Sequence, residues 1–198
     1  SAARRGTYLA TASFLFLSVS LLLTLNAFSG PLRVFNPENA MVRMDGVALF
    51  LMAIVLIGAM LTVLASSKYL EHIHSNWGEF YTLVLSSVTG MMFLVAASDL
   101  IMLFLSLELM SIPVYALAGF RRASLRSNES AVKYFLIGSF ASGILLYGSS
   151  LLYGATGSLD LVRVAEAVLS GQGNRMILLF GLVFVVSGIG FTLGAAPY

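Results

Sequence analysis

One acidic side chain lies in the middle of a long apolar stretch. Leu100–Phe120 is long enough for a helix that crosses a bilayer, and Glu108 is the only charged residue in it. Glu108 follows Leu100 at about 12 Å along such a helix, which is close to the middle of the hydrocarbon layer. A carboxylate at that depth costs several kcal/mol unless it is protonated, paired or hydrated. Such a group suits the uptake and release of protons. The alternative is a neutral acid that hydrogen-bonds to a neighbouring helix.

A proline follows shortly after this acid. Pro113 removes one backbone hydrogen bond and clashes with the carbonyl group of Leu109. The sequence therefore predicts a kink beside Glu108 that admits water. A kink that serves only helix packing is the alternative.

A second ionisable group precedes another apolar stretch. Lys133 lies in "SAVKYFLIGSF", four residues after Glu129. A lysine there extends its ammonium group to the membrane surface or pairs with Glu129 along one helix face. The alternative is a lysine that faces the interior of the bundle and carries protons. The residues alone leave both interpretations open.

The composition indicates which elements hold these groups. Of the 198 residues, 59% are hydrophobic and only 10% are charged, and the mean hydropathy is +0.93. Soluble domains carry about 25% charged residues, so this chain is predicted to be an all-α, polytopic membrane protein. The apolar segments are continuous rather than alternating, which argues against a β-barrel. Six membrane-spanning helices are predicted near residues 7–28, 46–66, 79–97, 100–120, 130–153 and 176–196.

Two segments depart from simple spans. "VVSGIGFTLGAAPY", at the end of the chain, combines glycines with Pro197, which predicts a broken last helix. An ordinary glycine-rich packing face is the alternative. "GSLDLVRVAEAVLSGQGNR" has apolar residues at helical spacing and predicts a short amphipathic helix. That helix lies on the membrane surface or packs on protein.

Local signals set the ends of the helices. "SD" at 98–99 predicts a tight turn between two antiparallel helices, and Ser127 or Asn128 is the predicted N-cap of the fifth span. Basic residues are slightly more frequent on the side of the N-terminus, which favours the cytoplasm or matrix for that side. The side of the N-terminus carries Arg4, Arg5, Lys68, Arg121, Arg122 and Arg126. The other side carries Arg33, Arg43, Arg163 and Arg175.

Several kinds of chemistry are excluded or disfavoured. The chain has no cysteine, so disulfides, Fe–S ligation and thiol chemistry are excluded. His72 and His74 lie in one polar segment without further ligands at suitable spacing, so they are interpreted as solvated histidines rather than a metal site. No basic stripe for nucleic acid and no glycine-rich phosphate loop is present.

Three segments together resemble a known family. "LELMSIPVYALAGF", "KYFLIGSFASG" and "GIGFTLGAAPY" are similar to the subunit N family of proton-pumping NADH–quinone oxidoreductase, respiratory complex I. The mitochondrial counterpart is NADH dehydrogenase subunit 2, and the family belongs to the antiporter-like proteins. The resemblance covers nearly all of residues 41–198. It implies leading helices in 1–78, followed in 79–198 by most of the first of two inverted repeats.

The resemblance also implies a function. Subunits of this kind carry no redox centre and move protons, driven by quinone reduction elsewhere in the complex. Glu108 matches the glutamate of a Glu/Lys pair, and Lys133 matches a lysine of the same buried polar chain. Thr192 stands where the family usually has lysine. A hydroxyl group relays protons through water but is no cationic partner for Glu108.

The expected surroundings follow from the same resemblance. The partners are other membrane-arm subunits and lipids. NAD, FMN, Fe–S clusters and quinone are expected in those partner subunits, with no cofactor and no metal in this chain. The location is the bacterial inner membrane or the mitochondrial inner membrane. Full-length members have about fourteen helices, so this chain is expected to be a fragment or a split product that does not pump alone.

Two other functions remain open at this point. The chain is a structural spacer of the membrane arm if Glu108 is only a satisfied polar contact. It is an Mrp-type cation/proton antiporter subunit if it works outside complex I. Both alternatives keep the same helical architecture.

Overall fold

The computed structural model describes residues 2–28, 30, 33–34, 41–73, 77–171, 173–192 and 194. Six helices of this part are long and apolar enough to cross a membrane, which confirms the predicted polytopic bundle. The elements in chain order are α1 (Ala2–Ala27), β1 (Arg33–Val34), β2 (Arg43–Met44), α2 (Gly46–Ile73), α3 (Trp77–Ala96), α4 (Leu100–Ala118), α5 (Leu125–Thr156), α6 (Leu161–Ser170) and α7 (Arg175–Thr192).

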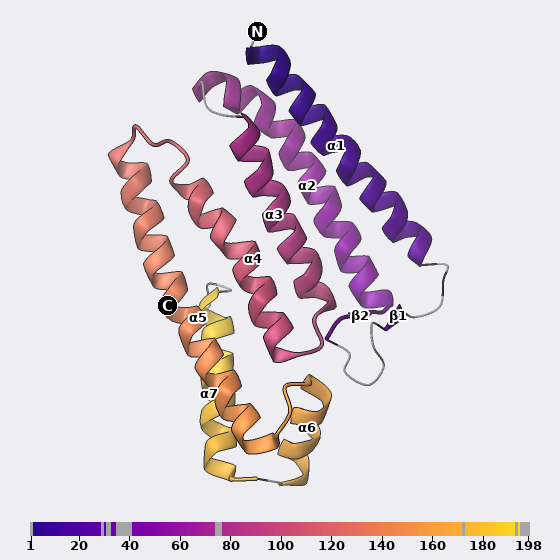
Figure 1. The fold of residues 1–198 in the computed structure, drawn as a ribbon, viewed down its shortest axis with the longest axis vertical. Helices are drawn as coiled ribbons and strands as arrows, with labels where there is room; N and C mark the ends of the chain where they lie inside the picture. Colours follow the sequence, from indigo (N-terminus) through magenta and orange to yellow (C-terminus); the bar gives the residue numbers. More distant parts are fainter. Residues whose placement is uncertain are drawn as a thin grey trace.

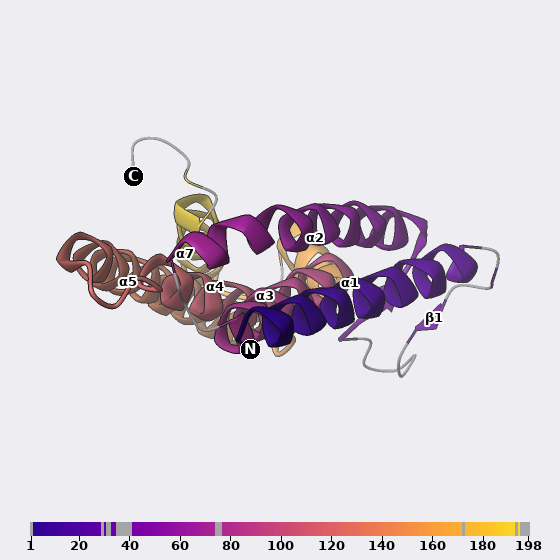
Figure 2. The ribbon, with the colours of Figure 1, turned by 90° about the horizontal axis from the view of Figure 1, so that it is seen from above.

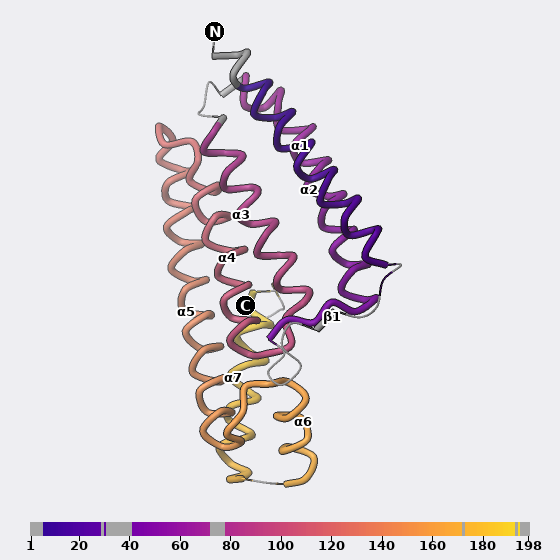
Figure 3. Tube along the Cα trace, turned by 45° about the vertical axis from the view of Figure 1, so that its right-hand side comes forward, coloured from indigo at the N-terminus to yellow at the C-terminus, as the bar shows by residue number. Residues whose placement is uncertain are grey.

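The spans lie side by side in chain order. Figure 1 shows α1 to α5 as a row, with α7 along the lower half of α5 and α6 at the lower end. Seen from above, α5 and the far end of α1 lie at opposite sides of the molecule (Figure 2). The α1–α2 pair diverges from α3 towards β1 (Figure 3). This order brings α4, α5 and α7 together.

Small residues allow α3 and α4 to make close backbone contact. A side chain at Gly90 would lie 2.7 Å from the backbone carbon of Leu109 and the Cα atom of Met110. The Ser87 hydroxyl donates a hydrogen bond of 3.0 Å to the carbonyl oxygen of Met110. These contacts brace α4 beside Glu108 and just before Pro113. The helix continues through Pro113 without interruption.

Glycines also line the contact between α5 and α7. A Cβ atom at Gly148 would lie 2.7 Å from the backbone nitrogen of Val185, and one at Gly188 would lie 2.8 Å from Cβ of Leu145. Without side chains at these positions the two backbones approach closely, which is how many membrane helices associate. The glycine-rich packing face, which was the alternative to a broken last helix, is therefore present on α7.

A short seam joins the first residues of α4 to those of α6. The Leu100 N–H donates to the Leu159 carbonyl oxygen at 3.0 Å, and the Leu161 N–H donates to the Ser98 carbonyl oxygen at 3.1 Å. Asp99 and Asp160 cap the two helices, each through a carboxylate that accepts from two backbone N–H groups. The predicted short connection between α3 and α4 is present at residues 97–99, but Asp99 is extended rather than part of a tight turn.

Several helix boundaries differ from the prediction, among them the start of α1 at Ala2 rather than near residue 7. The α5 helix begins at Leu125 rather than near 130, because Ser124 is the N-cap and accepts a hydrogen bond from the Ser127 N–H. Ser127 and Asn128 were therefore the wrong cap residues. The α2 helix continues to Ile73 rather than ending near 66. The strands β1 and β2, which form one antiparallel pair, were not predicted.

The predicted amphipathic helix is present as α6. Val164 and Ala167 are buried, and Val164 belongs to a core cluster with Leu100, Leu145 and Leu178. One face of α6 therefore packs on protein. The opposite face leaves Leu169 almost fully exposed.

The last helix stops partway along its neighbours. The α7 helix ends at Thr192, beside the middle of α5 rather than at the end of the bundle (Figure 1). Gly194 then has a φ of +69°, a left-handed conformation that a residue with a side chain rarely adopts. Pro197, the other residue behind the predicted break, lies outside the described residues.

Candidate functional site

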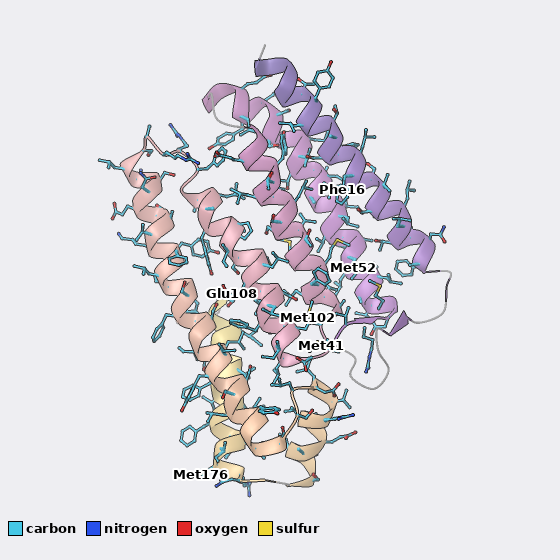
Figure 4. The ribbon with its side chains drawn as sticks, in the orientation of Figure 1. Phe16, Met41, Met52, Met102, Glu108 and Met176 are labelled. Atoms are coloured by element: carbon cyan, nitrogen blue, oxygen red, sulfur yellow. The ribbon has the colours of Figure 1, made fainter. Side chains whose placement is uncertain are left out.

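Glu108 lies at the middle of the α4 span. The helix extends from Leu100 to Ala118, and the glutamate side chain is half-buried. Figure 4 shows Glu108 between α4 and the end of α7, on the side towards α5. Among the described residues, no side chain forms an ion pair or a hydrogen bond with its carboxylate. Glu108 therefore lies midway along an apolar helix of membrane-spanning length, and its depth in a membrane stays a prediction.

Two buried polar residues follow Glu108 along α4. Ser111 and Tyr115 lie three and seven residues further on, which places all three on one helix face. Side chains of a helix lean towards its N-terminus, so the Tyr115 ring leans back towards Ser111. Glu108 therefore belongs to a polar stripe rather than standing alone.

The Tyr115 ring makes the contact with α5. Its centroid lies 4.7 Å from that of Tyr134 and 5.9 Å from that of Phe135, both edge to face. A Cβ atom at Gly138 would lie 2.6 Å from Cζ of Tyr115 and would also collide with its hydroxyl oxygen. The phenol therefore rests directly on the backbone of α5, and the glycine is what makes room for it.

A pocket of about 150 Å³ opens where α4, α5 and α7 meet. Its polar wall consists of four hydroxyl residues, and we call it the hydroxyl pocket. Water occupies about 30 Å³ per molecule in the liquid, so the space suits about five water molecules. The hydroxyl residues are Ser111, Tyr115, Tyr134 and Thr192, and the apolar side chains around them include Met91, Met110, Val114 and Phe191.

Thr192 closes this pocket from α7. It is the last residue of that helix, and its hydroxyl donates a hydrogen bond of 3.0 Å to the Gly188 carbonyl oxygen. The oxygen lone pairs remain available to accept hydrogen bonds from water. Of the residues singled out from the sequence, Thr192 lines the pocket, and Glu108 shares a helix face with two other residues that line it.

Lys133 lies apart from this arrangement. Its ammonium nitrogen is 2.5 Å from a Glu129 carboxylate oxygen, and both side chains are well exposed in this chain. Lys133 is not among the residues that line the hydroxyl pocket, whereas its neighbour Tyr134 is. The structure thus forms the surface pair that the spacing allowed and does not bring Lys133 to Glu108.

Sequence reasoning missed three of the pocket residues. Ser111 and Tyr115 had a readable signal, because they follow Glu108 at helical spacing. Tyr134 had none, since it reaches the pocket only through the packing of α5 against α4. In the described part of the chain, no group of three or more His, Asp or Glu side chains is placed to hold a metal ion. His74 lies outside the described residues.

Several known membrane proteins are similar in sequence to this chain. Residues 97–198 match the family described as NADH:quinone oxidoreductase/Mrp antiporter, transmembrane. The chain is 44% identical over 158 residues to NADH-quinone oxidoreductase subunit N of Trichlorobacter lovleyi, covering 79% of this chain and 32% of that protein. It is 38% identical over 194 residues to NAD(P)H-quinone oxidoreductase subunit 2 of Synechocystis, covering 96% and 36%. The chain spans about a third of the length of the curated relatives it matches.

Solved structures show the same architecture. A chain of respiratory complex I from Thermus thermophilus aligns with a TM-score of 0.77 at 33% identity, covering 97% of this chain and 40% of that one. A chain of the Mrp complex from Dietzia aligns with a TM-score of 0.74 at 18% identity, covering 94% and 36%. The second likeness shows the fold alone.

Proposed function

The chain belongs to the NADH:quinone oxidoreductase/Mrp antiporter transmembrane family, and from this premise we propose that it moves protons within the membrane arm of an NADH–quinone oxidoreductase. The similarity to subunit N proteins over most of this chain supports that choice within the family. Electron transfer takes place in partner subunits, which hold the NAD, FMN, Fe–S and quinone sites. This chain takes part in the translocase reaction through proton transfer alone.

One observation carries the proposal. Glu108 lies halfway along an apolar span and shares a helix face with Ser111 and Tyr115, which line the hydroxyl pocket. An ionisable side chain at membrane depth is costly, and it persists where it serves an ion pathway. The adjoining pocket offers the water contacts that a proton needs in order to leave the carboxyl group.

The location and orientation form part of the same proposal. The chain crosses the membrane several times, and the membrane is the bacterial inner membrane, where the other membrane-arm subunits are its partners. Figure 1 places the N-terminus, the end of α2 and the α4–α5 loop at one end of the bundle. That end carries the Arg121, Arg122 and Arg126 cluster, and the excess of basic residues favours the cytoplasm for it.

The test is Glu108→Gln in the complete subunit within the whole complex. The amide keeps the size and the hydrogen bonding of the side chain but cannot exchange a proton in the physiological range. We expect proton pumping, and the NADH oxidation coupled to it, to fall by at least about tenfold. This lower limit is set below the usual loss for a removed proton-transfer group. The readouts are NADH oxidation and dye-reported acidification in sealed vesicles, each normalised to the amount of assembled complex.

Glu166→Gln on α6 is the matched control. Glu166 is an exposed acid on a helix that contributes nothing to the hydroxyl pocket. Pumping in this variant should equal that of the unmodified complex. Unchanged pumping in Glu108→Gln would remove Glu108 from the proton route.

A structural spacer is the second candidate, and one observation favours it. Lys133 pairs with Glu129 on the surface of this chain, and Thr192 is neutral, so no cation accompanies Glu108 among the described residues. For a spacer, Glu108→Gln and Lys133→Gln would lower the yield of assembled complex. Pumping per assembled complex would stay the same.

A further inference from the structure

The hydroxyl pocket extends the polar stripe of Glu108 across three helices. Glu108, Ser111 and Tyr115 come from α4, Tyr134 comes from α5 and Thr192 from α7. The Tyr115 ring contacts Tyr134, and Tyr115 shares one face of α4 with Ser111 and Glu108. Tyr115 is thus the residue of this set that belongs to the Glu108 stripe, lines the pocket and contacts a ring of the facing helix.

We propose that Tyr115 transfers protons between Glu108 and water held in the hydroxyl pocket, with Ser111, Tyr134 and Thr192 holding that water. This inference rests on the proposed function and names the next group on the route after the carboxyl group. The pocket then works with neutral hydroxyl groups and water, because none of its described lining residues is cationic.

The transfer is balanced without any redox change. The O–H bond of a protonated Glu108 carboxyl group breaks and leaves a carboxylate, while its proton passes to the Ser111 hydroxyl oxygen. The Ser111 hydroxyl releases its own proton to the phenol oxygen of Tyr115, where a new O–H bond forms. The original O–H bond of the phenol breaks, and its proton goes to a water molecule of the pocket. The phenol is left neutral, and rotation of the hydroxyl group restores the starting arrangement.

The fit of Tyr115 on α5 argues that the position of its hydroxyl group matters. Any side chain at Gly138 would collide with the phenol oxygen, so α5 leaves room for a tyrosine hydroxyl at that point. A phenylalanine would fill the same apolar contacts with Tyr134 and Phe135. The hydroxyl group is therefore the part of the side chain that packing against these rings does not explain.

The experiment compares three Tyr→Phe changes in the complete subunit within the whole complex. Tyr115→Phe and Tyr134→Phe each remove one pocket hydroxyl and keep the ring. Tyr147→Phe is the matched control, because Tyr147 is an exposed tyrosine of α5 that packs near Phe184 and does not line the pocket. Pumping, NADH oxidation and the amount of assembled complex are measured for each, in H₂O and in D₂O.

We expect Tyr115→Phe to slow pumping by about tenfold, below the usual loss for a proton-transfer group because water partly replaces the hydroxyl. Tyr134→Phe should slow it less, and Tyr147→Phe should leave it unchanged. The ratio of rates in H₂O and D₂O should rise in Tyr115→Phe, since proton transfer then limits the rate. A purely structural role for the ring would leave that ratio unchanged.

A fourth variant moves the hydroxyl group without removing it. Gly138→Ala places a methyl group against the Tyr115 phenol, so pumping should fall although every pocket hydroxyl is still present. If Tyr115→Phe does not assemble, Tyr134→Phe and Gly138→Ala decide the matter by the same readouts, normalised to assembled complex.

The outcomes separate the two proposals. The proposed role of the pocket is overturned if Tyr115→Phe, Tyr134→Phe and Gly138→Ala show the same pumping and the same isotope ratios as Tyr147→Phe. If Glu108→Gln is still impaired, the proposed function stands while this inference fails. If Glu108→Gln is unimpaired as well, both fail together.

Discussion

Thr192 gives the hydroxyl pocket its contribution from α7. Its hydroxyl group donates a hydrogen bond to the Gly188 carbonyl oxygen, which leaves the oxygen lone pairs available to accept from water. Thr192→Val keeps the shape of the side chain and removes the oxygen, whereas Thr192→Ser keeps the oxygen. A net hydrogen bond is worth about 0.5–1.5 kcal/mol, so pumping should fall roughly two- to tenfold in Thr192→Val.

Thr192→Ser should pump at the rate of the unmodified complex, because a serine hydroxyl can make the same contacts with water. Both variants are measured by acidification in sealed vesicles. Loss in Thr192→Ser without loss in Thr192→Val would show that the methyl group, and not the oxygen, is what matters at this position.

Lys133 differs from Thr192 because its ammonium group already has a partner, the carboxylate of Glu129. An exposed pair of this kind is worth about 0.5 kcal/mol or less, so Glu129→Gln should leave thermal stability nearly unchanged. If Lys133 carries protons, Lys133→Gln should lower pumping severalfold while Glu129→Gln should not. Equal and small effects of both changes would indicate that the pair is only a surface contact.

The α5–α7 contact depends on the absence of side chains. Gly148 lies against the backbone of α7, whereas a Cβ atom at Gly154 on the same helix would meet nothing within 4 Å. Gly148→Ala should destabilise the packing by about 1–3 kcal/mol, the usual cost of overfilling a close contact. Gly154→Ala should be neutral or stabilising, since alanine favours a helix more than glycine does.

The measurement for this pair is the temperature at which the detergent-solubilised complete subunit unfolds. A shift of the same size in both variants would contradict the assignment of Gly148 to the contact. Pumping should follow stability in Gly148→Ala, because α7 holds Thr192 in the pocket.

The elements themselves were largely predictable, and the reasons are local. Glu108 stood out because a single charge interrupts an apolar run that is otherwise uniform, and helix length then fixed its depth. The start of α5 was wrong by several residues because Ser124, Ser127 and Asn128 are all good N-cap residues. Sequence alone does not rank them.

The hydroxyl pocket was beyond the reach of such reasoning. The described residues of its walls come from four helices, and the relative rotation of these helices depends on contacts such as Gly138 with Tyr115 and Gly148 with Val185. These contacts are non-local, so no periodicity within one helix reports them. The same limit applies to Lys133, for which the spacing allowed two roles.

At the scale of the whole molecule, the proposed orientation is testable with single introduced cysteines, because the chain itself contains no cysteine. Arg121 lies in the α4–α5 loop, and Leu169 is exposed on α6 at the other end of the bundle (Figure 1). A membrane-impermeant thiol reagent should label Leu169→Cys from the periplasmic side and Arg121→Cys only in inverted vesicles. The complete subunit is used, on a background free of other cysteines.

Labelling in the opposite sense would reverse the orientation and leave the fold unaffected. Labelling of both positions from one side would contradict the arrangement of the spans. The slight excess of basic residues makes this a direct check on a weak signal.

The seam between residues 98–100 and 159–161 has a consequence for how related sequences can diverge. It joins the first residues of α4 to those of α6 by hydrogen bonds, so the two ends of the intervening chain are held close together. One residue inserted within α4 before Tyr115 would rotate everything after it by about 100° around the helix axis. Insertions and deletions should therefore be rare inside α4 and α5 across evolution, and should gather in the loop at 119–124, where extra length turns no helix face away from its neighbour.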